Sequence, residues 1–203
     1  MKRIRFKYVL GVLVIAGFLA GLAYIVSRGF SARDEPTAAE AFIARRLRHL
    51  AIPRAARAAS NPVPASPEVF AEAMEHFADH CAFCHANDGS GDTPIGKGLY
   101  PKPPDMREPA TQRLSDGELF YIIQNGVRFT GMPAFGTADG SHDQDSWKLV
   151  RFIRHLPQIT AEEVERMKEM NPKSPADLEE EENIKRFLEG DDSPPSNERH
   201  KHE

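Results

Sequence analysis

The longest apolar stretch of the chain lies close to its first residue. Tyr8 to Val26 is a run of 19 residues without a charged side chain. Coiled as an α-helix, this run would be about 28 Å long, which is enough to cross the hydrocarbon core of a bilayer. We therefore predict a transmembrane helix over residues 8–26.

The charges around this run predict its orientation. Residues 1–7 carry four basic side chains and no acidic one, which favours a cytoplasmic position for this segment. The rest of the chain would then lie on the periplasmic side of the inner membrane, held by a single span. A cleaved signal peptide is the alternative, although the apolar region is long for one and Ser27-Arg28-Gly29 is a poor cleavage site. Both interpretations export the following residues.

Residues 27–66 combine one amphipathic helix with a linker rich in Pro and Ala. Thr37 and Glu40 have capping-box spacing, so a helix is expected from residue 38 to about residue 50. Its apolar side chains are Phe42, Ile43, Leu47 and Leu50. We expect this helix to pack on the following domain, with lipid headgroups or a partner protein as alternatives. Residues 52–67 predict an extended spacer between the membrane and that domain.

Residues 67–157 have the pattern of a small helical domain, because apolar residues recur at helical spacing and no strand pattern is visible. Helices are expected after Ser66, after Ser115 and near Asp145 or Ser146. Their apolar positions are Phe70, Met74 and Phe77 in the first, Leu119, Phe120, Ile122 and Ile123 in the second, and Trp147, Val150 and Ile153 in the third. The fold is predicted to be all-α.

Two further helices are predicted in residues 158–190, the first of them beginning after Thr160, which has capping-box spacing with Glu163. Residues 191–203 are polar enough to be disordered. His200 and His202 lie in this tail, where they can bind a metal ion weakly, but a solvated tail is the simpler interpretation. The whole chain has 203 residues, is 40% hydrophobic and carries a formal net charge of -4. This balance gives no indication of a nucleic-acid partner.

The candidate chemistry is concentrated in Cys81-Ala82-Phe83-Cys84-His85. Two thiols three residues apart can add to the two vinyl groups of a haem, and the adjacent imidazole can bind its iron. The chain has no other cysteine, so a structural zinc site lacks its second pair of ligands. A thioredoxin-like redox pair would need a βαβ context that this sequence does not have. A simple disulfide between Cys81 and Cys84 remains open.

A second candidate ligand is Met132, which stands between Gly131 and Pro133 in a predicted loop. Flanking Gly and Pro are typical of a rigid loop held close to a flat group. Other side chains that can compete for the same role are Met74, Met106, Met167, Met170, His80, His142 and His155. The proline-rich stretch 96–106 is expected to wall one haem face and to accept a hydrogen bond from the ring of His85.

Taken in order, these motifs resemble a class I monohaem cytochrome c of the bacterial, membrane-anchored type. The resemblance covers residues 67–157 and rests on the Cys-x-x-Cys-His motif, the proline-rich loop, the capped helix after Ser115, the loop around Met132 and the last helix with Trp147. It implies an all-α fold around one haem c. It also implies that Cys81 and Cys84 form the thioether bonds, that His85 is the proximal iron ligand and that Met132 is the distal one.

The function that follows is one-electron transfer by a membrane-tethered carrier in a periplasmic respiratory chain, with no catalytic residues of its own. Expected partners are redox proteins such as a quinol-oxidising complex, a dehydrogenase or a terminal oxidase. The alternative is a cytochrome c subunit of a larger dehydrogenase or respiratory complex. A haem peroxidase or a gas sensor would need an open sixth iron position, which Met132 argues against.

Overall fold

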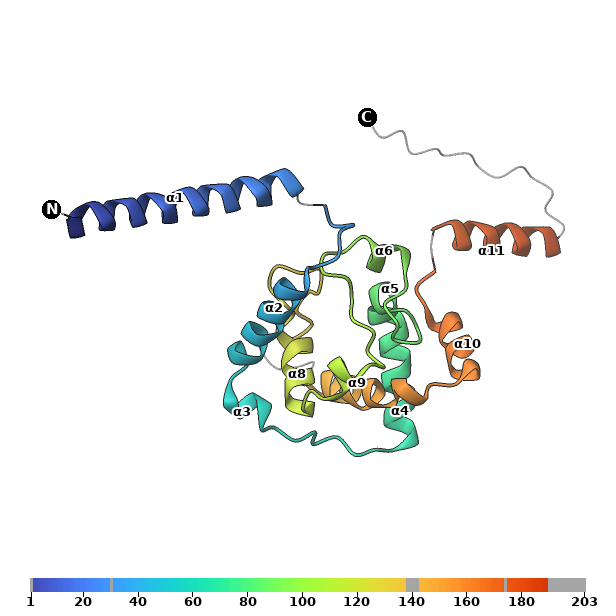
Figure 1. The fold of residues 1–203 in the computed structure, drawn as a ribbon. Helices are drawn as coiled ribbons and strands as arrows, with labels where there is room; N and C mark the ends of the chain where they lie inside the picture. The colour runs from blue at the N-terminus through green and yellow to red at the C-terminus, as the bar shows by residue number, and fades with distance from the viewer. Residues whose placement is uncertain (1, 30, 138–142, 174, 190–203) are drawn as a thin grey trace.

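The computed structural model describes residues 2–29, 31–137, 143–173 and 175–189, and its described elements are helical (Figure 1). In chain order they are α1 Lys2–Arg28, α2 Ala38–Ala51, α3 Arg54–Arg57, α4 Pro67–His76, η1 Phe77–Cys81, α5 Ala82–His85, α6 Pro94–Lys97, α7 Pro109–Gln112, α8 Asp116–Asn125, α9 Asp143–His155, η2 Leu156–Gln158, α10 Ala161–Met170 and α11 Pro175–Leu188. The predicted all-α fold is confirmed.

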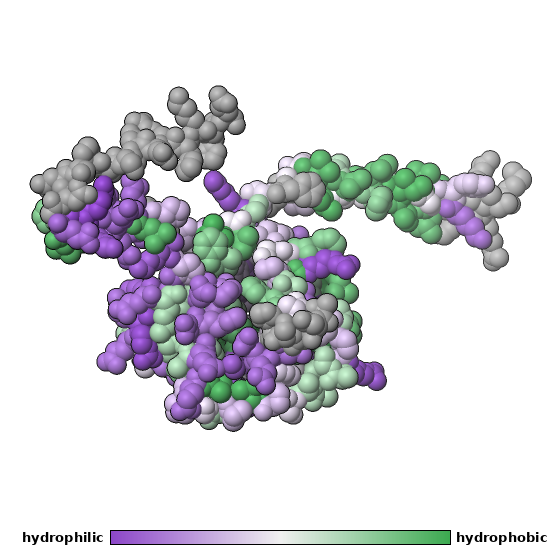
Figure 2. All heavy atoms as spheres, turned by 180° about the vertical axis from the view of Figure 1, so that it is seen from behind, coloured by the Kyte–Doolittle hydropathy of each residue, from purple (hydrophilic) through white to green (hydrophobic). Residues whose placement is uncertain are grey.

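Helix α1 projects from the rest of the molecule. Its segment Lys7–Ser27 has 21 residues, a mean hydropathy of 2.6 and no buried residue. Figure 2 shows it as an apolar rod attached to a largely hydrophilic body. By length and composition this helix can span a membrane, a test that a signal sequence would also pass.

The predicted helix starts are formed by the expected side chains. Thr37, Ser66, Ser115 and Thr160 each accept a hydrogen bond from the backbone N–H three residues later, at the beginnings of α2, α4, α8 and α10. The capping boxes of α2, α8 and α10 are complete, because the side chain of a glutamate accepts a hydrogen bond from the backbone N–H of the capping residue. A cap of this kind stabilises a helix by about 1 kcal/mol, so these boundaries depend on local sequence.

The core lies where α4 crosses α9. The ring of Phe152 is 5.6 Å from that of Phe70 and 5.0 Å from that of Phe77 between centroids, and Phe77 and Phe152 are fully buried. Helix α8 joins this pair through Phe120, whose ring stacks on Trp147 at 4.0 Å. The last domain helix, α9, therefore crosses the helix that leads to the cysteines.

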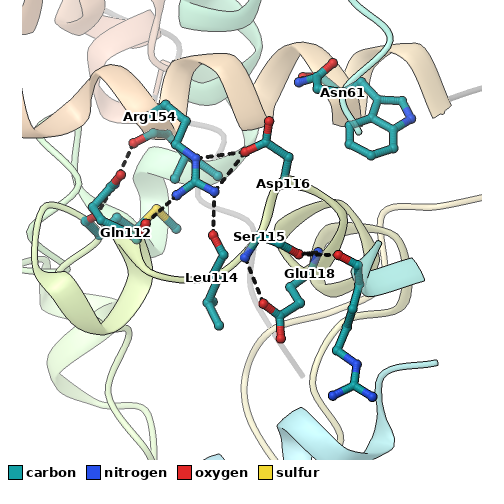
Figure 3. A network of polar contacts seen from close by, with 11 residues as sticks. Asn61, Gln112, Leu114, Ser115, Asp116, Glu118 and Arg154 are labelled. Carbon is teal, nitrogen blue, oxygen red and sulfur yellow. Dashed lines mark hydrogen bonds and ion pairs between the residues drawn. The ribbon is translucent and has the colours of Figure 1, made fainter. Parts of the chain in front are cut away.

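A polar network joins the end of α9 to the start of α8 (Figure 3). The guanidinium of Arg154 donates to the Asp116 carboxylate at 2.9 and 2.8 Å, to the Gln112 carbonyl at 2.8 Å and to the Leu114 carbonyl. The side-chain amide of Gln112 in turn donates to the carbonyls of Met106 and a residue of α9. These bonds fix the loop that precedes α8 on the core.

Residues 52–66 differ from the extended spacer that the sequence predicts. Ile52 and Val63 are buried, and the short helix α3 lies between them. Arg151 of α9 donates two hydrogen bonds to the Val63 carbonyl, and the side chain of Asn61 donates to a backbone carbonyl of α9. The segment can approach α8 closely because Gly117 of α8 has no side chain, and a Cβ atom there would lie 1.9 Å from the Ala56 carbonyl oxygen.

The compact body also continues past residue 157, where we expected the domain to end. Met167 of α10 is fully buried in the core, and Glu163 binds His155 of α9 at 3.0 Å. Helix α11, in contrast, keeps Ile184 and Phe187 exposed. The predicted disordered tail, with its two histidines, lies outside the described residues.

Candidate functional site

The Cys-x-x-Cys-His motif occupies the last turns of the helix that begins with α4. At η1 the helix widens by one residue, so that the N–H of Ala82 bonds to the carbonyl of Phe77, five residues earlier. Such π-turns interrupt a helix and are frequent at functional sites. Cys81, the last residue of this turn, and Cys84 are half-buried, and His85 is buried, with 8% of its surface exposed. The motif therefore presents two thiols and an imidazole on one short helical segment.

Both cysteines are free thiols, so the disulfide left open by the sequence is not formed here. Burial, and then the neighbouring Cys84, raise the pKa of Cys81 to about 12. Burial also raises the pKa of Cys84. Thiol–disulfide enzymes depend on the opposite shift, because the thiolate is their nucleophile. Among the described residues, no group of three or more His, Cys, Asp or Glu side chains is arranged to hold a metal ion.

The imidazole of His85 has the properties of an iron ligand. Burial lowers its pKa to about 4, so the ring is neutral at pH 7 and keeps a free lone pair. Its Nδ1 is buried without a hydrogen-bond partner in the part of the chain that the structure describes. The expected bond to a carbonyl of the proline-rich loop is therefore not formed. A buried polar atom left unpaired costs about 1–3 kcal/mol, and this ring has an orphaned nitrogen beside two thiols, which fits haem attachment.

The loop after His85 is held against the Cys-x-x-Cys-His motif by hydrogen bonds to backbone carbonyls of the motif. Gly91 donates its N–H to the carbonyl of His85 at 2.8 Å, and the hydroxyl of Thr93 donates to that of Cys84 at 3.3 Å. Ala86, at φ 60°, makes the sharp reversal that this return requires. Farther along, the N–H of Met106 donates to a carbonyl of the same loop. The backbone of the motif is thus fixed from outside the helix.

Met132 lies in a loop that is attached to the end of α8. Its carbonyl accepts a bond from the N–H of Val127 at 3.1 Å, and the N–H of Phe135 donates to a carbonyl of α8 at 3.0 Å. Gly126 ends α8 at φ 64°, where a side chain would meet the Met132 carbonyl at 2.7 Å. A side chain at Gly131 would meet Leu99 of the proline-rich loop at 2.7 Å. Met132 itself is half-buried against the core.

The competing methionines pack in the hydrophobic core. Met74, Met106 and Met167 are buried in the hydrophobic core, with 1%, 7% and 0% of their surfaces exposed. Met170 is half-buried and packs against the same core. Their thioethers fill the interior, as methionines do in irregular core gaps.

The competing histidines that the structure describes are already paired. His80 binds Asp79 at 3.0 Å and stacks on His76 at 4.6 Å between ring centroids. His155 contacts the ring of Phe70 edge-on at 4.6 Å, in addition to its bond with Glu163. His142 lies outside the described residues. These contacts agree with surface or core roles for His80 and His155.

Sequence reasoning missed the contacts that attach α2 and its approach to the domain. Nδ1 of His49 lies 2.8 Å from Oε1 of Glu118, a buried carboxylate, and Glu35 pairs with Lys102 of the proline-rich loop. Glu118 was visible in the sequence only as the capping glutamate of α8. Its partner stands 69 positions away, so no local pattern indicates the pair.

Comparison with known families covers this part of the chain. Residues 68–153 match a family model described as cytochrome C oxidase, cbb3-type, subunit III. The matched stretch contains the cysteine motif, the proline-rich loop, the Met132 loop and most of α9. No curated protein matches the chain.

Proposed function

We infer that residues 68–153, a class I cytochrome c domain that carries haem c covalently, serve as a one-electron carrier tethered to the inner membrane on its periplasmic side. The observation that carries the proposal is the buried, neutral imidazole of His85 directly after two half-buried thiols. The chain has only these two cysteines, which supports a single haem. Residues 1–7 support the orientation, because they are basic and precede the apolar helix.

Each site residue has a distinct task in this proposal. Cys81 and Cys84 would hold the haem by thioether bonds, and His85 would bind its iron through a ring that stays unprotonated at neutral pH. Met132 would be the second protein ligand, from a loop restrained at both ends by backbone bonds to α8 and to its own turn. When bound, haem c supplies an iron that takes up and releases one electron between Fe(III) and Fe(II).

The proposed thioether ligand distinguishes a carrier from a haem peroxidase or a gas sensor. With His85 and Met132 both bound to the iron, neither a substrate nor a gas would have a free position on it. The attachment of the Met132 loop to α8 supports a ligand that stays in place. Methionine ligation also raises the reduction potential, which suits electron transfer late in a respiratory chain.

The cysteines are tested first. In the variant Cys81→Ser with Cys84→Ser, the purified protein should be colourless. The wild-type pigment should remain on the polypeptide after acid–acetone extraction. Pigment that is extracted from the wild type, or retained by the double variant, contradicts the attachment proposed here.

Met132 is tested with the variant Met132→Leu, which keeps the volume and removes the sulfur. We expect loss of the weak near-infrared band of thioether-ligated ferric haem, a lower reduction potential and new binding of carbon monoxide. The matched controls are Met106→Leu and Met167→Leu, which change buried methionines of the core and should leave the band intact. A band that survives in Met132→Leu, or disappears in Met106→Leu, refutes this ligand assignment.

A second candidate is a cytochrome c subunit of a larger oxidase or dehydrogenase. The description of the matched family, a subunit of a cytochrome c oxidase, favours it, as do the exposed apolar residues Ile184, Phe187 and Leu188 of α11. Extraction of native membranes with a mild detergent, followed by native electrophoresis and haem staining, separates the two. A carrier should migrate alone, whereas a subunit should migrate with a large complex of constant composition.

A further inference from the structure

Helix α2 has an apolar face that no other described part of the chain covers. Four large apolar side chains of this helix are exposed: Phe42 at 55%, Ile43 at 55%, Leu47 at 61% and Leu50 at 72%. With 3.6 residues per turn, these positions fall on one side of the helix. A globular protein normally turns such a stripe toward its core, so its exposure needs an explanation.

The opposite side of α2 is the one that packs on the domain. Ala41 and Arg48 are half-buried there, and His49, at the edge of the apolar face beside Phe42, bonds to Glu118. Near its start, Glu40 accepts a hydrogen bond from the hydroxyl of Tyr100 at 3.3 Å. These contacts fix how α2 is rotated, and they turn its apolar face away from the body.

Arginines accompany the apolar face. The guanidinium of Arg46 lies 5.3 Å from the centre of the Phe42 ring, on the apolar side of the helix. Arg54, in the short helix that follows, is also exposed. Apolar residues interleaved with long cationic side chains are typical of helices that lie in the headgroup region of a bilayer, where the stem is buried in lipid and the charge meets phosphate.

The position of α2 along the chain brings it to the membrane surface. Only residues 29–37 separate the end of α1 at Arg28 from the start of α2 at Ala38. Nine residues span at most about 30 Å when fully extended, and here Glu35 is already held on the domain by Lys102. Figure 1 shows α2 on the flank of the body from which α1 projects.

We propose that α2 lies flat in the headgroup layer of the membrane that α1 spans, with its apolar face in lipid and Arg46 and Arg54 at anionic headgroups. The inference rests on the proposed membrane anchoring and adds the orientation of the domain. Because α2 is bound to lipid on one side and to α8 on the other, the haem domain is held against the bilayer. It does not swing on a flexible spacer, and its electron-transfer partner is then a protein within or against the same membrane.

The proposal is tested by photo-crosslinking in the full-length, haem-loaded protein. Benzophenone-alanine is placed at Ile43, at the centre of the apolar face, and at Arg45, which is exposed but about 200° farther round the helix. A third variant places it at Leu13 of α1. Each is reconstituted singly in nanodiscs of phosphatidylethanolamine and phosphatidylglycerol, irradiated and analysed by mass spectrometry. Unchanged absorption spectra verify that the variants are folded.

We expect lipid adducts at Leu13 and Ile43, and at least tenfold fewer at Arg45. In nanodiscs of phosphatidylcholine alone, which carry no net charge, the yield of lipid adducts at Ile43 should fall several-fold. An unchanged yield would show that the arginines do not bind anionic headgroups. Adducts at Leu13 without adducts at Ile43 overturn the inference and leave the anchor intact. Adducts at neither position overturn the anchor as well. Crosslinks from Ile43 to protein show that this face binds a polypeptide and also overturn the inference.

Discussion

The contact between α3 and α8 can be broken by a single methyl group. Gly117, in the first turn of α8, is buried beneath α3, and a Cβ atom there would stand 1.9 Å from the Ala56 carbonyl oxygen and 2.9 Å from that of Ala59. Both neighbours are backbone atoms, so no side-chain rotation relieves the clash. Helix α3 has to retreat by about 1.5 Å, and overpacking of this kind typically costs 1–3 kcal/mol.

For Gly117→Ala we therefore expect the free energy of unfolding to fall by about 1–3 kcal/mol, which corresponds to a Tm lower by roughly 3–10 °C for a body of this size. Thermal unfolding of the haem-loaded protein, followed by circular dichroism, measures this Tm. Trypsin should also cleave faster after Arg54 and Arg57, because α3 is displaced from α8. The matched control is Gly98→Ala, whose added Cβ finds only ordinary contacts, the nearest at 3.4 Å. Equal Tm values and equal tryptic patterns in the two variants would refute the docking of residues 52–66.

The remaining predictions concern the other long-range contacts. Burial works to raise the pKa of Glu118, but bonds from Ser115 and His49 outweigh it and hold that pKa below its usual value. A carboxylate of this kind stabilises the fold above its unfolded pKa of about 4.3 and loses this effect as the pH falls through the folded value. The Tm difference between wild type and Glu118→Gln should therefore be largest at pH 7 and shrink below about pH 4; a constant difference contradicts this. Met167→Ala should lower the free energy of unfolding by about 2–5 kcal/mol in urea titrations. The control Ile184→Ala, on exposed α11, should change this free energy by less than about 0.5 kcal/mol. Equal losses in the two variants would show that α10 is not part of the core.

The sequence by itself determined the local elements of this protein. The helix starts at Thr37, Ser66, Ser115 and Thr160 are confirmed, because a cap and its partner are three residues apart and depend on nothing distant. The apolar run of α1 and the cysteine motif are equally local. Both can be recognised from composition and residue spacing, which do not depend on how the chain folds.

Only the tertiary structure decided how these elements combine. The docking of residues 52–66 depends on Gly117, a residue far along the chain whose missing side chain lets two backbones meet. Met167 lies beyond residue 157, where the domain was expected to end, yet it is fully buried in the core. The His49–Glu118 pair joins positions 69 residues apart. Such contacts depend on how the whole body packs, because each side chain fits a space formed by residues that are distant in the sequence. No local sequence pattern predicts that space.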